Sequence, residues 1–465
     1  MSAPTDCLLS APEEETRRLR LMPKAVLTAL PDAVQDWCAQ TGFTGAANQT
    51  CFIPDALKEE AGTDVFIGAA PDPTIWTLSA FAQNADGGSY ELVDQLDPHH
   101  ATDVAIGWIL GQYRFDRYKK GATAKATNKL VLPKGADSEK VTAIATAIGL
   151  VRDLINTPAE DMGPAEIEAA AETLAAEYEA SVTTLRGQVL KDAVFPAIHA
   201  VGRAAADNRA PRLIDMRWSG NGGPLLTLVG KGVAFDSGGL NIKPFVGMRW
   251  MKKDMGGAAH VLGIASAIMA LNLPVQLRVL IPAVENAISG NAFRPGDILE
   301  TRAGLSVEVG NTDAEGRLIL CDTLTYACEE KPDLLIDFAT LTGAARVAMG
   351  AEIPAVFCNT DSLWDGLEKA SAETSDPIWR LPLYDGYREL LDSPIADLCN
   401  ISDGPFAGAI TAGLFLDSFV DHEVPWAHFD CFAWQPKAKP GRTMGGEAQG
   451  LRATLSYIEG WLAAQ

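Results

Sequence analysis

The chain has 465 residues, with 38 Lys and Arg against 60 Asp and Glu, which gives a formal net charge of −22. Hydrophobic residues make up 47% and charged residues 21% of the chain, a composition typical of folded globular proteins rather than disordered ones. The acidity argues against partners that need a basic surface, namely nucleic acid and anionic membranes. The length fits two large domains or about three smaller ones.

The cysteine pattern and the beginning of the chain point to the cytoplasm. Eight cysteines are scattered without a Cys-x-x-Cys pair, which is typical of a reduced protein. The first fifteen residues lack a basic segment followed by an apolar run, and no apolar stretch reaches the roughly 18 residues of a membrane span. We therefore expect a cytoplasmic protein without a signal peptide or a transmembrane helix.

The first part of the chain mixes short apolar runs with turn residues. Apolar side chains at helical spacing predict a helix over 101–118, and a short apolar run predicts a strand over 130–132. The basic segment 119–129 between them is expected to be a surface loop. A further helix is predicted over 138–155, with Ser138 as its N-cap, and we expect it to connect two domains.

Predicted strands and helices alternate from about residue 164 onward. The expected helices cover 165–178, 255–271 and 318–330, and the expected strands cover 225–229, 277–283 and 334–339. This alternation predicts an α/β domain with a largely parallel sheet covered by helices on both faces. Sites in such sheets form at the carboxyl ends of the strands, which is where unusual polar residues fall in this chain.

Charged residues are concentrated beside apolar strands in three segments: VGKGVAFDSGGLNIKP at 229–244, MKKDMGG at 251–257 and NTDAEGRL at 311–318. In the first segment, Phe235 occupies a position where a dinucleotide fingerprint and a nucleophile elbow each need glycine. Glycine follows Lys231, so the segment is not a P-loop either. The plain alternative is a glycine-rich turn with solvated charges.

The third segment is harder to explain by local structure alone. Asp313 and Glu315 are two residues apart, so an extended backbone would point both carboxylates the same way, with Arg317 in the same register. The plain alternative is a helix N-cap at Thr312 or Asp313. A cap needs one such residue, however, and does not require a second acid and an arginine.

Together the three segments supply four carboxylates and three cations: Asp236, Asp254, Asp313 and Glu315 with Lys231, Lys243 and Arg317. Clustered carboxylates repel one another and burial raises their pKa values, a conflict that divalent cations resolve. Two metal ions about 3.5–4 Å apart can share a bridging hydroxide and polarise a carbonyl. A lysine beside the metals could ligate once neutral, and one farther away could stay charged and stabilise an oxyanion.

The motif NTDAEGRL resembles the signature of the leucyl aminopeptidase family, the M17 cytosol aminopeptidases. The resemblance extends in order through VGKGVAFDSGGLNIKP, MKKDMGGAAHVLG, PAVENAISGNAFRPGD, DFATLTGA and GAITAGLFL, from about residue 156 to the C-terminus. It implies a macro-domain-like α/β domain at 1–137, matched by position only, and a linker helix at 138–156. The catalytic α/β/α domain would occupy 157–465, with a central, mostly parallel, mixed sheet.

The resemblance implies a metal-dependent enzyme that hydrolyses the N-terminal residue from peptides with a free N-terminus. Two divalent ions, Mn²⁺ or Zn²⁺ with Mg²⁺ as an alternative, would be held by Lys231, Asp236, Asp254, Asp313 and Glu315. A water or hydroxide that bridges the metals would be the nucleophile.

The resemblance also assigns roles around the metals. Lys243 would stabilise the tetrahedral intermediate, and Arg317 would hold a bicarbonate ion that acts as general base. The substrate would be bound by Met251, Thr340, Leu341 and Gly343. Family members form homohexamers, so a homohexamer is expected.

The sequence departs from the family after Asp430, where the family carries small residues and this chain has the bulky Phe432 and Trp434. The segment 440–447 also replaces a shorter glycine-rich one. These aromatic side chains either pack in the core or narrow the pocket floored by Met251, which would disfavour large N-terminal residues.

Two other functions stay open at this point. Lys243 and Arg317 would also suit a two-metal phosphoesterase, although no phosphate-cradling loop is evident. Some family members bind DNA, but the net charge of −22 argues against a DNA-binding role for this chain. Among the histidines, His428 in the apolar run WAHFD is predicted to be a structural, hydrogen-bonded residue.

Overall fold

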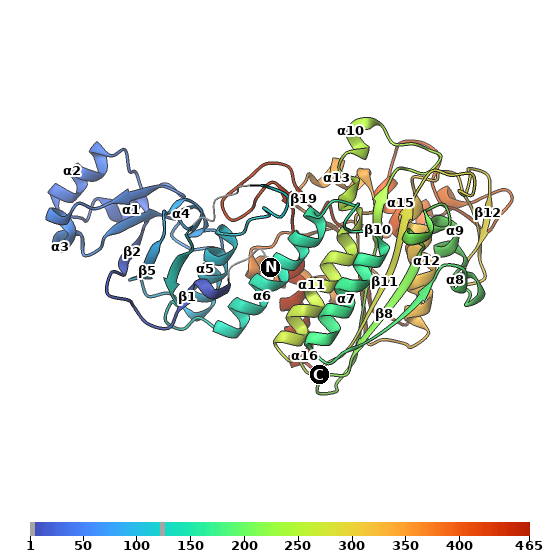
Figure 1. Ribbon diagram of the computed structural model, residues 1–465, viewed down its shortest axis with the longest axis horizontal. Coiled ribbons are helices and arrows are strands. Elements are labelled where there is room, and N and C mark those ends of the chain that lie inside the picture. The colour runs from blue at the N-terminus through green and yellow to red at the C-terminus, as the bar shows by residue number, and fades with distance from the viewer. Residues whose placement is uncertain (1–4, 121–125) are drawn as a thin grey trace. The chain divides into compact units, whose positions relative to one another are not determined.

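The computed structural model describes residues 5–120 and 126–465, and it divides into two compact units (Figure 1). The first unit comprises Met1–Gly149 with Lys437–Met444, and the second comprises Leu150–Pro436 with Gly445–Gln465. The division falls inside helix α6 (Ser138–Asn156), which the sequence predicts as the connecting helix. The domain boundaries at 137 and 157 stay a prediction. Among the helices of the described residues, none is long and apolar enough to cross a membrane.

The first unit is built on a six-stranded sheet in which β3 is antiparallel to β4 and the other strands are parallel. The strands in spatial order are β1 (Leu8–Leu9), β6 (Asn128–Val131), β5 (Gly88–Leu92), β2 (Arg17–Met22), β4 (Val65–Gly68) and β3 (Thr50–Phe52). Its helices are α1 (Lys24–Leu27), α2 (Asp32–Gln40), α3 (Lys58–Ala61), α4 (Ser79–Asn84) and α5 (Pro98–Gly111).

Two local predictions in the first unit are wrong. Helix α5 ends at Gly111 rather than at 118, because the Gln112 side chain turns to hydrogen-bond the backbone of Asn128 in β6. Helix α6 is capped by Asp137 rather than Ser138: the Asp137 carboxylate accepts the Lys140 N–H at 3.0 Å. Residues 121–125 of the predicted basic loop lie outside the described part of the chain.

The second unit contains a nine-stranded mixed sheet, as expected. The strands in spatial order are β16 (Trp379–Arg380), β15 (Ala355–Cys358), β18 (Trp426–Asp430), β14 (Leu334–Ala339), β9 (Leu225–Gly230), β11 (Gln276–Asn286), β8 (Arg212–Trp218) and β7 (Ser181–Arg186), and β10 (Gly232–Asp236) also pairs with β11. Strands β18, β14, β9 and β11 are parallel to their neighbours in the centre, whereas β7, β8 and β15 pair antiparallel toward the edges. The predicted, mostly parallel sheet is therefore confirmed.

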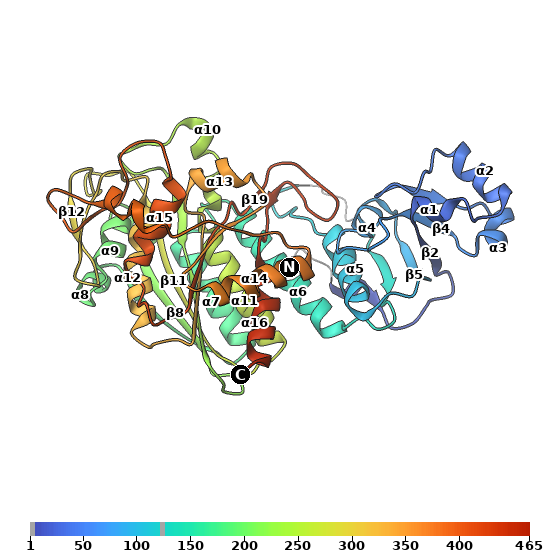
Figure 2. The same cartoon turned by 180° about the vertical axis from the view of Figure 1, so that it is seen from behind.

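Helices cover both faces of this sheet (Figures 1 and 2). One layer holds α7 (Pro164–Glu177), α11 (Gly256–Ala270) and α16 (Leu451–Ala463), and the other holds α9 (Pro196–Gly202), α12 (Glu315–Cys328) and α15 (Gly408–Asp417). Helix α11 is buried from Gly256 to Met269, because it lies between the sheet and the other helices of its layer. A helix that is apolar on all sides can only be stable in such a position.

The remaining elements of the second unit are short or peripheral. The α-helices are α8 (Gln188–Asp192), α10 (Phe245–Met248), α13 (Gly343–Met349) and α14 (Asp361–Thr374), and the 3₁₀ helices are η3 (Asp207–Arg209), η4 (Met251–Met255) and η5 (Asp385–Leu391). Five short strands form two small sheets: β12 (Ile298–Glu300), β13 (Ser306–Glu308), β17 (Leu398–Cys399), β19 (Trp434–Gln435) and β20 (Gly445–Gly446).

The start of α12 is the prediction that fails with most consequence for the site. The helix begins at Glu315 instead of Leu318, so Glu315 and Arg317 belong to its first turn and not to an extended segment. Its N-cap is Ala314, which makes no side-chain cap, so capping by Thr312 or Asp313 is also wrong. An acidic residue in the first turn is favoured by the partial positive charge at a helix N-terminus.

Candidate active site

The candidate site lies where several strands of the second sheet end. Lys231 directly follows β9, Asp236 is the last residue of β10 and Thr340 follows β14. These strand ends pack closely against the start of α11. A Cβ added to Gly257 would lie only 2.0 Å from the Phe338 carbonyl oxygen. Only glycine permits this approach, so GG in MKKDMGG is a packing requirement of the site.

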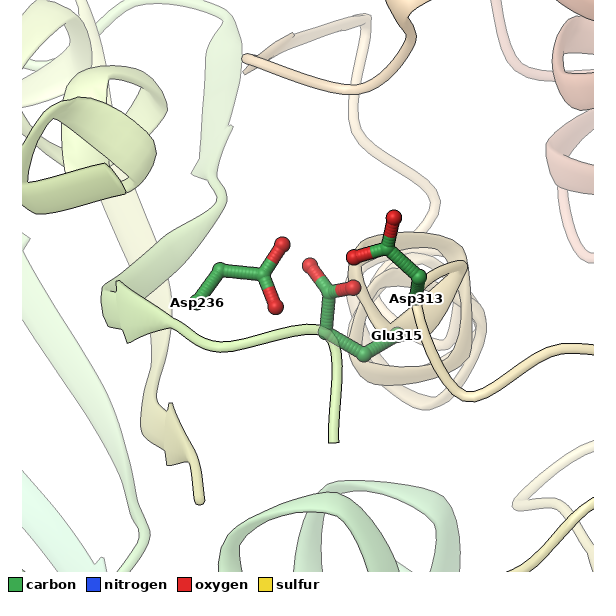
Figure 3. Close-up of side chains that lie close together, drawn as sticks. All are labelled: Asp236, Asp313 and Glu315. Atoms are coloured by element: carbon green, nitrogen blue, oxygen red, sulfur yellow. The ribbon is translucent and has the colours of Figure 1, made fainter. Parts of the chain in front are cut away.

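Three carboxylates converge in the site. Oxygens of Asp236, Asp313 and Glu315 lie within 4.8 Å of one another, and Figure 3 shows the three carboxylate groups pointing toward a common space. Asp236 and Glu315 are almost completely buried, whereas the Asp313 side chain is about one-third exposed. Glycine after Glu315 leaves room for the lysine, since a Cβ on Gly316 would lie 2.7 Å from Lys231 Nζ and would displace it.

Lys231 joins the fourth predicted carboxylate to this group. Its Nζ lies 2.7 Å from Asp254 Oδ2 and 2.9 Å from Glu315 Oε1, and it donates a hydrogen bond to the Thr340 carbonyl at 3.1 Å. Burial opposes the charged form, but the surrounding carboxylates, Asp254 first, outweigh it and raise the pKa of Lys231. In the absence of metal ions, Lys231 is therefore a charged residue that compensates the acidic cluster.

Lys243 approaches the same cluster from the other side. Its Nζ lies 2.7 Å from Asp236 Oδ2 and 2.5 Å from Asp313 Oδ1. Burial opposes its charge as well, yet the carboxylates, led by Asp236, raise the pKa of Lys243. Lys243 therefore stays protonated at neutral pH.

The carboxylates respond differently to their surroundings. Burial first, and the charge of Asp236 second, raise the pKa of Glu315 to about 8 and the pKa of Asp313 to about 6. Burial acts the same way on Asp254, but neighbouring lysines, Lys231 foremost, overcome it and lower the pKa of Asp254 to about 2. The predicted rise is thus confirmed for Glu315 and Asp313 and wrong for Asp254, because two lysines, Lys231 and Lys253, lie beside that carboxylate.

The donor set fits divalent cations. Both carboxylate oxygens of Glu315 are buried, yet within the described residues neither accepts a hydrogen bond, although one lies beside Lys231. Buried oxygens without a donor are costly and mark a position for a missing partner. Carboxylate oxygens without thiolates suit Mg²⁺, Mn²⁺ or a pair of Zn²⁺ ions. The structure brings all five predicted ligands together, and their role as ligands stays a prediction.

Arg317 is close in sequence to the cluster but does not join it. The guanidinium is buried and donates from Nη1 to the Asn400 carbonyl at 2.7 Å, and in the described chain it makes no ion pair. Its Nε has no partner among the described residues, and burial lowers the pKa of Arg317 to about 10. The predicted substrate residue Met251 is buried in η4, beside the segment that carries Asp254.

The predicted substrate loop, residues 340–343, is held by side chains at both ends. The Thr340 hydroxyl donates to Asp254 Oδ1 at 2.8 Å. The Asp430 carboxylate, at the end of β18, accepts the N–H groups of Leu341 and Thr342 at 3.0 and 3.1 Å. Gly343 then begins α13. The loop is therefore positioned by the same strand ends that carry the acidic cluster.

Sequence reasoning missed three side chains of the site region. Asn286 donates to Asp236 Oδ1 at 2.8 Å, and its signal was a lone amide at the end of an apolar strand. Asn400 accepts the N–H groups of Gly310 and Asn311 from a distant part of the chain, so no local signal could reveal it. Lys253 is 5% exposed, and burial lowers its pKa while Asp254 opposes this effect. Its signal was a lysine within an otherwise buried turn.

The prediction for His428 is confirmed. Its Nδ1 lies 2.6 Å from Asp337 Oδ1, and Asp337 also accepts the Trp426 indole N–H at 2.7 Å. All three side chains are buried in β14 and β18. This histidine stabilises the sheet and lies outside the acidic cluster.

A chain of two α/β units, the larger of which gathers four carboxylates and two charged lysines near the strand ends of a mixed sheet, fits the class of two-domain metallohydrolases. The sequence model of the cytosol aminopeptidase family, catalytic domain, matches residues 149–455. The model of the M17 aminopeptidase N-terminal domain matches residues 19–133. The chain belongs to the cytosol aminopeptidase family and is a metal-dependent aminopeptidase.

Individual relatives agree with this assignment. The "Probable cytosol aminopeptidase" of Syntrophotalea carbinolica is 42% identical over 98% of this chain and 97% of its own length. The crystal structure of the cytosol aminopeptidase from Coxiella burnetii shares 46% identity, covers 98% of this chain and 99% of its own, and superposes with a TM-score of 0.91. The bottromycin maturation enzyme BotP in complex with Mn is 30% identical over 96% of this chain and 99% of its own, with a TM-score of 0.85.

Proposed function

We propose that this aminopeptidase cleaves the first residue from peptides at the centre formed by Asp236, Asp313 and Glu315. One observation carries the proposal: these carboxylate oxygens lie within 4.8 Å of one another, and the buried Glu315 Oε2 has no hydrogen-bond partner among the described residues. Such an arrangement is unfavourable without cations and favourable with them.

Two divalent ions would be held by the five ligands Lys231, Asp236, Asp254, Asp313 and Glu315, with Mn²⁺ or Zn²⁺ as the expected metals and Mg²⁺ as an alternative. When bound, the ions would supply an activated water as the nucleophile and polarisation of the peptide carbonyl. Lys231 would ligate through its nitrogen after losing its proton, which the cations would favour. The complex of the similar enzyme BotP with Mn supports this choice of metal.

Lys243 is proposed to stabilise the tetrahedral intermediate. Its ammonium is mostly buried, stays charged at neutral pH and lies beside Asp236 and Asp313. A fixed cation in a partly buried site stabilises the negative charge that develops on the carbonyl oxygen far better than water does. It therefore lowers the barrier without having to reorganise.

Arg317 is proposed to hold a bicarbonate ion that acts as general base on the attacking water. The support is its buried guanidinium, whose Nε has no partner among the described residues. A guanidinium fork matches a planar, bidentate oxyanion. The substrate would lie against Met251 and along the backbone of Thr340, Leu341 and Gly343.

The free α-amine of the substrate is proposed to bind beside Asp313, the most exposed of the four carboxylates. A neutral amine can ligate a metal there, whereas the amide nitrogen of an internal residue cannot, which would restrict cleavage to the first bond. We further propose that the enzyme is cytoplasmic and homohexameric. Light scattering of the purified chain tests the hexamer, and a monomeric mass would contradict it.

Metal removal and replacement test the function directly. EDTA is expected to abolish hydrolysis of Leu-p-nitroanilide, and Mn²⁺ or Zn²⁺ is expected to restore it. Asp313→Ala should be folded by circular dichroism but inactive, and retained activity would refute the assigned centre. Turnover of phosphate esters without any peptide turnover would favour the phosphoesterase instead.

The bulky residues after Asp430 are proposed to narrow the first-residue pocket. Phe432 and Trp434 both pack near Trp250, with ring centroids 6.0 and 6.3 Å away, which also agrees with simple core packing. The values of kcat/KM for the p-nitroanilides of Ala, Leu and Phe separate the two interpretations. Equal or better turnover of the Phe substrate contradicts a narrowed pocket.

A further inference from the structure

Lys253 is a buried cation whose hydrogen-bonding capacity is unused. Its Nζ lies 3.6 Å from Asp254 Oδ1, too far for a charge-assisted hydrogen bond, and that oxygen already accepts the Thr340 hydroxyl at 2.8 Å. The ammonium makes no hydrogen bond to any described residue, although the side chain is only 6% exposed. An ammonium has three donors, and no described residue accepts a hydrogen bond from those of Lys253.

A second cation meets Lys253 at one aromatic ring. Lys253 Nζ lies 5.2 Å from the centroid of the Phe432 ring, and the guanidinium carbon of Arg346 lies 5.0 Å from the same centroid. Arg346 is exposed on α13, and within the described chain its side chain forms neither an ion pair nor a hydrogen bond. The ring holds both cations by cation–π contacts but satisfies none of their N–H donors.

The position of this trio relates it to the substrate rather than to the core. Lys253 lies two residues after Met251, and Arg346 is in the helix that follows the loop 340–343. Phe432 follows Asp430, the carboxylate that holds the backbone of that loop. The trio is therefore flanked by each segment proposed to contact the first residue of the substrate.

We propose that Lys253 and Arg346, held against the Phe432 ring, bind the carboxylate of an acidic first residue. This inference rests on the proposed aminopeptidase function and names its substrate class: peptides that begin with Asp or Glu. A carboxylate offers acceptors to both cations at once, which a neutral side chain of the same shape does not. The side chains of Asp and Glu are also smaller than that of Phe, in agreement with a pocket that Phe432 narrows.

The test compares the α-p-nitroanilides of Glu and Gln, which differ in charge but hardly in shape, on the Mn²⁺-loaded full chain. The wild type is expected to show a higher kcat/KM for Glu than for Gln. Lys253→Met should lower this Glu/Gln ratio by about tenfold or more, the worth of a hydrogen bond to a charged group. Arg346→Met should lower it by about threefold, because its cation is exposed. The ratio is independent of the amount of active enzyme.

Lys252→Met is the matched control. The neighbouring Lys252 donates to the Asn156 carbonyl at 2.5 Å and lies over the Trp434 ring instead, so its removal should leave the ratio unchanged. Arg346→Met, at the surface, keeps the proposal testable if Lys253→Met does not fold.

Four outcomes overturn the inference. A Glu/Gln ratio below one in the wild type, or a ratio unaffected by both Lys253→Met and Arg346→Met, shows that no acidic side chain binds there. The dipeptides Leu-Leu and Leu-Leu-amide differ only in the terminal carboxylate. If the variants lower kcat/KM for Leu-Leu relative to Leu-Leu-amide but leave the Glu/Gln ratio unchanged, the cations bind the terminal carboxylate of short peptides instead. If the metal-loaded wild type hydrolyses none of these substrates, the aminopeptidase proposal itself fails, and the subsite fails with it.

Discussion

Two buried ionic clusters lie on the same sheet of the second unit, and they are built in opposite ways. In the first, Arg278 of β11 donates to Asp215 of the adjacent strand β8, with Nη2 at 2.8 Å and Nε at 3.2 Å. The guanidinium also lies 4.3 Å from the Tyr326 ring centroid and contacts the Tyr326 carbonyl. Each charge in this cluster has partners from the protein.

The second cluster, at the strand ends, is incomplete. Among the described residues, Glu315 Oε2 has no hydrogen-bond partner and Oε1 has only its ion pair with Lys231, and the pKa values of Glu315 and Asp313 are raised. Both clusters are buried and contain both signs of charge, so burial and charge alone do not distinguish a structural ion pair from an active site. The distinction is whether the protein itself supplies the partners.

The largest expected effect comes from Glu315→Gln. Loss of this carboxylate should lower kcat/KM for Leu-p-nitroanilide by about 10³-fold or more, comparable with the loss of a key electrostatic contact in the transition state. The free energy of unfolding without metal should change by less than about 1 kcal/mol, because the charged form of Glu315 is already disfavoured. Urea unfolding and steady-state kinetics measure the two. If Glu315→Gln were strongly destabilised, the cluster at the strand ends would be structural, contrary to the comparison.

Arg278→Met is the converse change. It leaves the buried Asp215 with only the partly exposed Arg217, 3.1 Å away, as a charged partner among the described residues. Breaking the buried pair should cost about 3 kcal/mol of unfolding free energy. Because the pair is distant from the strand ends, activity per folded molecule should be retained. Urea unfolding followed by fluorescence gives the stability. If Arg278→Met lowered the free energy of unfolding by less than about 1 kcal/mol, the cluster of Arg278 and Asp215 would not be important for stability.

A buried group that is satisfied in its neutral form sharpens the comparison further. His260 lies 2.6 Å from the Gly256 carbonyl through Nδ1 and accepts the Gln449 N–H through Nε2, and burial lowers its pKa to about 4. Its contribution is complete above the unfolded pKa of 6.5 and is lost as the pH falls toward 4, because the unfolded chain then binds the extra proton. The loss should reach about 3 kcal/mol.

The measurement is the free energy of unfolding against pH for the wild type and for His260→Asn. Groups common to both chains cancel, so the difference between the curves should change between pH 6.5 and 4 and stay constant above that range. Parallel curves across the whole range would show that the native state protonates His260 freely.

The smallest effect is metal-linked stability. At a free Mn²⁺ concentration of about 100 times Kd, binding to the native state alone should add about 2.7 kcal/mol to the wild type. Arg278→Met should gain as much, since its metal ligands are intact, and Glu315→Gln should gain less. Thermal unfolding of EDTA-treated protein with and without Mn²⁺ measures this. An equal gain in Glu315→Gln would place the ions elsewhere.

Periodicity predicted the main elements of the second unit because it is a local property of the chain. The predicted strand 334–339 is β14, and the predicted helix 255–271 differs from α11 by one residue at each end. The start of α12 failed because its acidic first turn looks like a loop in the sequence. The partners of Asn400 could not be predicted at all, since they lie about 90 residues away.

The sequence by itself determined the kind of chemistry: acidic residues and lysines beside apolar strands, in motifs whose order resembles one enzyme family. Only the tertiary structure decided how these charges pair. Lys231 lies beside both Asp254 and Glu315, yet neighbouring lysines lower the pKa of Asp254, whereas burial and the charge of Asp236 raise that of Glu315. The reason is physical: electrostatic energies depend on distances and desolvation, which folding alone sets, whereas a motif records only which groups are present.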